Sequence, residues 1–168
     1  MRGYTLIETL IVIAVIGLLI GIALPSFSAL VADNRRAATV NGLVTALNLA
    51  RHASLTRSRP TRVCPDGGDR CSDDWADGWL AFVEPPDWNT GQPIPEPFVL
   101  YRFGAIHGTL TLASNRTAYR FRPFRARSTN GTMLVCPAGR PGRAVVIAPS
   151  GRVRTTAEMP RWAPESCT

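Results

Sequence analysis

Two arginines near the C-terminus, Arg152 and Arg154, have the spacing of a phosphate-binding pair. In an extended strand alternate side chains project from the same face, so these two guanidinium groups are expected about 6–7 Å apart. That separation is close to the phosphate spacing along one DNA strand, and a guanidinium fork can bind two phosphate oxygens at once. Gly151, directly before the pair, allows the backbone to turn closely. This pattern favours the binding of a polyanion.

Other arginines in the same part of the chain could extend this contact. Arg140 and Arg143 lie in a turn-rich stretch and are expected to give a second contact, and Arg161, beside Trp162, a third. Residues 101–168 contain eleven arginines and two glutamates, whereas residues 63–100 contain one arginine and eight acids. A basic C-terminal third indicates a polyanionic partner. The alternative is a solvated arginine-rich surface without a ligand.

The residues expected of an enzyme are missing from the sequence. It shows no Ser/His/Asp arrangement, nucleophile elbow, His-rich metal motif or phosphate-binding loop, and all 19 basic residues are arginine. An acidic stretch could attract calcium but lacks EF-hand spacing, so we interpret it as a solvated loop; it contains Asp66, Asp69, Asp73, Asp74 and Asp77. We therefore expect no catalytic residue, no cofactor and no metal site.

Four cysteines lie beyond the N-terminal apolar segment, and an even number in an extracytoplasmic domain favours two disulfides. Three connectivities are possible. We expect Cys64 to pair with Cys71 across a short polar loop, and Cys136 to pair with Cys167, which would fix the C-terminal tail to a strand. Zinc is not expected, because no C-x-x-C spacing occurs.

The N-terminal segment has the length of a membrane-spanning helix. From Tyr4 to Leu24 its only charge is Glu8, and as a helix it would be about 31 Å long. A secretory signal would need a longer basic region and a small-residue cleavage site. A carboxylate within such a segment is costly and indicates a function. The simpler alternative is a plain membrane anchor in which Glu8 faces another helix.

The rest of the chain predicts an α+β domain. Apolar residues at helical spacing predict a long helix that ends before Pro60, at about residue 58; they are Val40, Leu43, Val44, Leu47 and Leu55, with Ala50 at the edge. Arg51 falls inside this stripe, and we expect it to reach an acid or extend to solvent. Eight short β-type runs follow: Arg62–Cys64, Trp79–Val83, Phe98–Phe103, Thr109–Leu112, Ala118–Phe121, Thr132–Cys136, Ala144–Ala148 and Arg152–Thr155. The expected architecture is one long helix, membrane-embedded in its first half and amphipathic in its second, packed on antiparallel sheet.

The stretch from Gly3 to Glu8, Gly-Tyr-Thr-Leu-Ile-Glu, resembles the leader of type IV pilins and pseudopilins, most of which have Phe where this chain has Tyr4. The resemblance implies cleavage after Gly3 by a prepilin peptidase and methylation of the new N-terminus, Tyr4. It also implies that Glu8 pairs with the N-terminal amine of a neighbouring subunit during filament assembly. The chain would then divide into a leader (1–3), a transmembrane helix segment (4–25) and a periplasmic or extracellular domain (26–168).

Further motifs resemble the GspH/FimT pseudopilin family. They are Leu47-Asn48-Leu49-Ala50-Arg51, Val63-Cys64-Pro65, the block of Trp75, Gly78, Trp79, Leu80 and Phe82, and Ala144-Val145-Val146-Ile147 followed by Ser150 to Arg154. Two departures stand out. Relatives usually have an acid where this chain has His52-Ala53-Ser54, and they commonly have a turn glycine near Phe124.

The Gly151-Arg152-Val153-Arg154 stretch resembles the GRxR motif of FimT-type minor pilins, which bind DNA during natural transformation. The implied function is non-specific DNA binding by a minor pilin. Its helix would lie in the bacterial inner membrane with the domain in the periplasm, and the protein would be surface-exposed within the pilus. The implied partners are DNA, other major and minor pilins, and the prepilin peptidase. The alternative is a structural minor pseudopilin, of a pilus or of type II secretion, that primes filament assembly without binding DNA.

Overall fold

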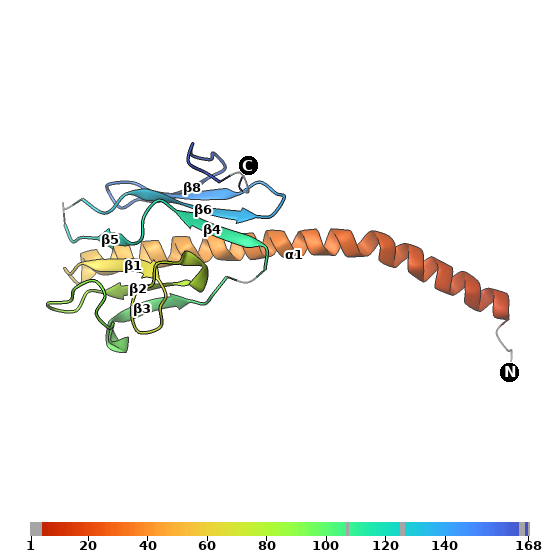
Figure 1. Ribbon diagram of the computed structural model, residues 1–168, viewed down its shortest axis with the longest axis horizontal. Coiled ribbons are helices and arrows are strands. Elements are labelled where there is room, and N and C mark those ends of the chain that lie inside the picture. The colour runs from red at the N-terminus through yellow and green to blue at the C-terminus, as the bar shows by residue number, and fades with distance from the viewer. Residues whose placement is uncertain (1–4, 107, 125–126, 165–166, 168) are drawn as a thin grey trace. The chain divides into compact units, whose positions relative to one another are not determined.

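A computed structural model describes residues 5–106, 108–124, 127–164 and 167, and within these ranges every side chain except those of residues 22–26 and 28. A single helix, α1 (Leu6–Thr56), begins the chain and continues through Pro25 (Figure 1). The chain divides into two compact units, Met1–Arg35 and Arg36–Thr168. The second unit contains the end of α1 and all the strands.

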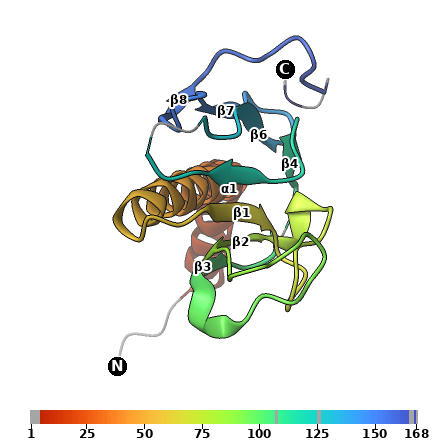
Figure 2. The ribbon, with the colours of Figure 1, turned by 90° about the vertical axis from the view of Figure 1, so that its left-hand side faces the viewer.

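Two four-stranded antiparallel sheets form the rest of the second unit. The first sheet has the order β3-β2-β1-β5, and the second has the order β4-β6-β7-β8 (Figure 2). The strands of the first sheet are β1 (Thr61–Pro65), β2 (Trp79–Val83), β3 (Val99–Phe103) and β5 (Tyr119–Phe121). Those of the second are β4 (Leu110–Ser114), β6 (Gly131–Pro137), β7 (Arg143–Ile147) and β8 (Val153–Thr156). Two short 3-10 helices, η1 (Trp75–Asp77) and η2 (Glu96–Phe98), precede β2 and β3.

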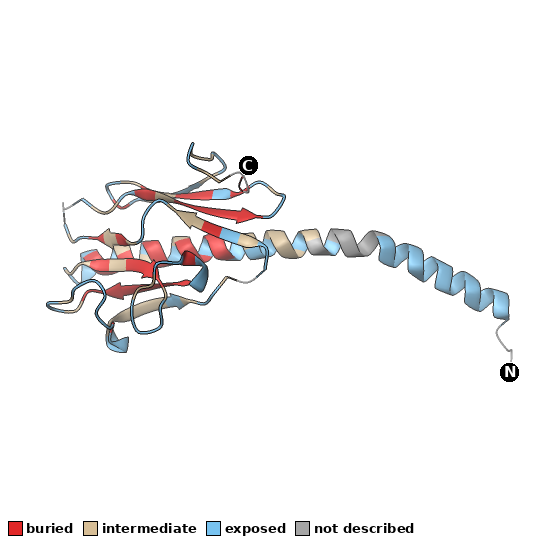
Figure 3. Cartoon of the chain, viewed as in Figure 1, coloured by how far each residue is buried: buried red, intermediate tan, exposed pale blue. Residues whose placement is uncertain are grey.

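One hydrophobic core joins α1 to both sheets (Figure 3). Leu43, Leu47 and Ala50 of α1 pack in the same cluster as β1, β2, β6 and β7 residues. The helix approaches the first sheet closely at Gly42, where a Cβ atom would lie 2.7 Å from Phe103 Cε2. The ring of Phe103 stacks on Trp79, with centroids 4.1 Å apart. A side chain at position 42 would therefore push against a packed aromatic pair.

The α+β architecture expected from the sequence is confirmed, with local differences. The buried face of α1 turns toward Ala53 and Ser54, so Leu55, expected in the stripe, is 47% exposed. The last strand begins at Val153 rather than at Arg152. Both disulfides have the expected pairing, Cys64–Cys71 and Cys136–Cys167.

The N-terminal unit is helical from Leu6, and Glu8 is exposed on it. Gly3 and Tyr4, the residues of the expected cleavage site, lie outside the described residues. Judged on the described residues alone, no helix has the length and apolar content needed to cross a membrane. The transmembrane segment expected over residues 4–25 stays a prediction.

Candidate nucleic-acid interface

The β7–β8 hairpin positions the two arginines singled out in the sequence. The Gly151 N–H donates to the Ala148 carbonyl at 2.8 Å, and the Ala148 N–H donates to the Arg152 carbonyl at 3.0 Å. Arg152 therefore continues the ladder one residue beyond β8, in which Arg154 pairs with Val146. Because side chains alternate along an extended segment, Arg152 and Arg154 lie on the same side, and both are exposed.

Gly151 packs the turn of this hairpin against two other elements. Its φ is 75°, a left-handed conformation that favours glycine. A Cβ atom would lie 3.0 Å from Ser128 Oγ, 3.3 Å from Phe121 Cδ1 and 3.4 Å from Arg51 Cδ. The Ser128 N–H also donates to the Pro149 carbonyl at 3.0 Å. The turn is thus fixed against β5, α1 and the segment that follows β5.

This packing places the chain segments that carry three further arginines next to the hairpin turn. Arg51 of α1 lies beside Gly151, and Arg122 and Arg127 belong to the β5–β6 connection. Arg51 makes no ion pair with a described acid. The aliphatic part of its side chain packs beside Gly151, which accounts for the position of Arg51 in the apolar stripe. We call the set Arg51, Arg122, Arg127, Arg152 and Arg154 the hairpin surface. Within the described ranges, none of their guanidinium groups forms a hydrogen bond or an ion pair.

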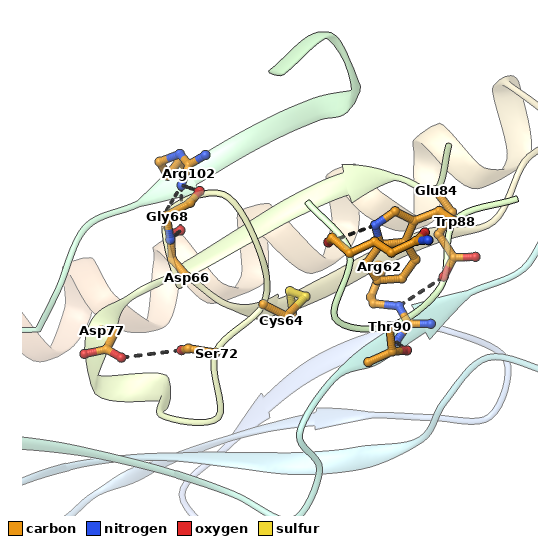
Figure 4. Close-up of a disulfide and its surroundings, with 12 residues drawn as sticks. Arg62, Cys64, Asp66, Gly68, Ser72, Asp77, Glu84, Trp88, Thr90 and Arg102 are labelled. Atoms are coloured by element: carbon orange, nitrogen blue, oxygen red, sulfur yellow. Dashed lines mark hydrogen bonds and ion pairs between the residues drawn. A yellow bond between two sulfur atoms is a disulfide. The ribbon is translucent and has the colours of Figure 1, made fainter. Parts of the chain in front are cut away.

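Arginines on the first sheet are instead neutralised by acids (Figure 4). Glu84, which is buried, accepts from Arg62 Nε at 3.0 Å and also from Arg120, and Arg62 lies over the Trp88 ring, 5.0 Å from its centroid. Arg102 pairs with Asp66 and Glu96, and the hydrogen bond to Asp66 raises the pKa of the Arg102 guanidinium. The positive charge available to a ligand is therefore concentrated away from this sheet.

The second contact expected from the sequence, at Arg140 and Arg143, is not beside Arg152. Arg143 is at the other end of β7, and strand alternation places it on the core-facing side with Val145, opposite to Arg154. It lines a cleft of about 320 Å³ with Arg36 of α1 and Thr155. The Pro141 carbonyl, in the same turn as Arg140, accepts from Arg36 Nη1 at 2.8 Å. The turn with Arg140 and Arg143 is therefore a separate basic region.

Arg161 belongs to the C-terminal segment after β8 and is exposed. The Cys136–Cys167 disulfide ties this segment to β6, where Cys167 packs with Leu134 and Ala144. Leu134 and Ala144 point away from α1, because their neighbours Val135 and Val145 pack in the core shared with the helix. Arg161 is therefore carried by a segment that crosses the outer side of the second sheet.

Comparison with known protein families identifies the family of this chain. The model of the family described as Type II transport protein GspH matches residues 39–151, and that of the Prokaryotic N-terminal methylation motif matches residues 1–24. The chain belongs to the GspH family. It is thus a protein of the pilin and pseudopilin class, as its leader and motifs indicated, and this class associates with other pilins.

Two solved structures share the fold of this chain. The chain is similar to two crystal structures of the Pseudomonas aeruginosa (strain PAO1) type IV minor pilin FimU. The P21 form has a TM-score of 0.57 at 20% identity, and the match covers 81% of this chain and 97% of the FimU chain in that structure. The P65 form has a TM-score of 0.53 at 20% identity, over 78% and 98%. No curated protein sequence is significantly similar to this chain.

Proposed function

We propose that this GspH-family protein is a minor type IV pilin that binds DNA without sequence preference during natural transformation. The observation that carries the proposal is the hairpin surface, where five arginines from α1, the β5–β6 connection and the β7–β8 hairpin lie without an acidic partner among the described residues. Unpaired guanidinium groups can bind phosphates directly, because no intramolecular ion pair must be broken first.

The contacts available are of the kind that hold the DNA backbone. Guanidinium groups bind phosphate oxygens, and phosphate contacts carry no sequence information by themselves. Non-specific complexes of this kind have dissociation constants of roughly 10⁻⁴–10⁻⁶ M at physiological salt. We therefore expect weak binding that depends steeply on ionic strength.

The test measures DNA binding by the full chain in detergent micelles over a series of salt concentrations. Replacing Arg152 and Arg154 together with Gln should lower the log–log salt slope by about 2, since each lost phosphate contact removes about 0.9. The melting temperature should not change, because both side chains are exposed. The matched control is Arg35→Gln with Arg70→Gln, which removes the same charge outside the hairpin surface and should leave the slope close to that of the parent. A double variant at 152 and 154 that binds like the parent would contradict the proposal.

A second candidate function follows from the family description, Type II transport protein GspH. In this alternative the protein is a structural minor pseudopilin that primes assembly of a type II secretion filament or a pilus, and the hairpin surface meets acidic side chains of neighbouring subunits. The two functions differ in a simple result. A parent chain that shows no DNA binding at low salt, while the double variant fails to enter filaments, favours the structural role.

We also propose the location and maturation that the leader implies. Residues 4–25 would anchor the chain in the inner membrane with a single pass, and the domain from residue 26 onward would lie in the periplasm until it enters the filament. The match to the N-terminal methylation motif supports processing by a prepilin peptidase after Gly3.

A further inference from the structure

Phe124 combines two features that are unusual in a folded domain. It is 76% exposed, and its φ is 58°, in the left-handed region. An aromatic residue rarely adopts this conformation, because its Cβ atom crowds the backbone. Strained residues of this kind often occur at binding sites, where the surrounding structure holds them in place.

The position of Phe124 relates it to the hairpin surface. It lies in the connection from β5 to β6, between Phe121 and Ser128, the two residues that contact Gly151 in the β7–β8 turn. Arg122 and Arg127 lie on either side of it in sequence, and both are exposed and have no ion pair with a described acid. An exposed aromatic ring therefore lies, in the sequence, between two cations that can hold a phosphate backbone.

Aromatic rings among arginines are the arrangement found in single-strand-binding proteins. There the cations follow the backbone and the bases stack on aromatic side chains, with little dependence on sequence. In a duplex each base face is already covered by its neighbours, so an exposed ring gains little from contact with it.

We propose that the hairpin surface binds single-stranded DNA, or a frayed duplex end, in preference to intact duplex, because Phe124 stacks on an unpaired base. This inference rests on the proposed DNA-binding function and names the form of DNA that the same site prefers. The arginines supply the attraction common to both forms, and Phe124 supplies the difference between them.

The experiment measures the affinity of the full chain in detergent micelles for a short oligonucleotide without self-complementarity, and for the same oligonucleotide as a duplex with closed hairpin ends. We expect the parent to bind the single strand more tightly. Phe124→Leu should weaken single-strand binding by at least about 5-fold, the lower limit for one stacked base, and leave duplex binding unchanged. Phe124→Trp should retain the preference, since it keeps an aromatic surface.

A matched control removes an exposed aromatic ring elsewhere. Phe27 is 65% exposed on α1, and Phe27→Leu should leave both affinities unchanged. Equal affinity of the parent for the two DNA forms, or an equal loss for both forms in Phe124→Leu, would overturn the inference while leaving DNA binding itself intact. Absence of salt-dependent binding to either form would overturn the proposed function, and the inference with it.

Discussion

At the scale of single residues, Gly151 shows how a short motif can combine folding and binding. Its positive φ and its contacts with Phe121, Ser128 and Arg51 are requirements of packing. The two arginines that follow in the chain project outward from the turn that this packing fixes. We therefore propose that Gly151 contributes to binding by positioning Arg152 and Arg154.

The first prediction separates these roles. Gly151→Ala should lower the free energy of unfolding by about 2–3 kcal/mol, through left-handed strain and crowding by neighbouring atoms. Gly139→Ala is the control, because Gly139 also has a positive φ, 65°, but no atom within 4 Å of the place where a Cβ would lie; strain alone should cost about 1 kcal/mol. Thermal unfolding followed by tryptophan fluorescence measures both. Equal losses would show that the turn does not pack against β5 and α1.

At the scale of elements, the sequence was sufficient for the helix and the approximate strands but not for their pairing. Apolar periodicity located α1, and β-type runs located each strand to within a few residues. The separation of Arg143 from Arg154 depends on the register of β7 and β8. Arg154 pairs with Val146, so their side chains lie on the same face of the sheet. The side chain of Arg143 lies on the other face. Composition does not reveal register, and a one-residue shift would have put both arginines on the same side.

The contribution of Arg51, Arg122 and Arg127 was missed for a related reason. They belong to elements far apart in the chain, and only the packing of the β7–β8 turn on β5 and α1 brings them together. A weak signal did exist, since Arg51 interrupts an apolar stripe and Phe124 stands where relatives commonly have glycine. Both residues indicated an unusual environment, but the sequence did not show that the β7–β8 turn lies next to their segments.

The two disulfides should differ in how much they stabilise the fold. Cys136 and Cys167 are 31 residues apart, whereas Cys64 and Cys71 are 7 apart. In the chain-entropy description, closing these loops stabilises by about 3.7 and 2.4 kcal/mol respectively. Replacing Cys136 and Cys167 with Ser should therefore lower the unfolding free energy by about 1 kcal/mol more than the same change at Cys64 and Cys71, measured by urea unfolding. A reversed order would show that strain or loop packing outweighs loop entropy.

At the scale of the whole molecule, charge is sorted between the two sheets. Acids of the region between β1 and β3 pair with arginines of the first sheet, as Glu84 does with Arg62 and Arg120. None of the arginines of the hairpin surface forms an ion pair with a described acid. The positive charges of the first sheet are therefore neutralised within the domain, whereas those beside the second sheet are not. The surface there is strongly basic although the net charge of the chain is only +7.

The N-terminal unit gives a prediction about the complete protein. Mass spectrometry of the membrane-extracted chain should find Tyr4 as the first residue, with a methylated amine, as the match to the methylation motif suggests. Glu8→Ala should leave membrane insertion intact and reduce entry into filaments, because the carboxylate is expected to pair with a neighbouring N-terminal amine. Glu8→Asp is the conservative comparison. An intact Met1 in the mature protein would contradict this maturation.

The order of the two disulfides has a consequence for how the protein matures in the cell. Each cysteine is joined to the next one along the chain, Cys64 to Cys71 and then Cys136 to Cys167. If the domain crosses the inner membrane as proposed above, residues 26–168 emerge in sequence order and present these thiols in the order in which they must join, so the first encounter of each pair is the native one. Oxidation by a thiol oxidase should be enough, with no reshuffling of wrong bonds. We expect the yield of oxidised protein to fall in cells without that oxidase and to be unaffected in cells without a disulfide isomerase.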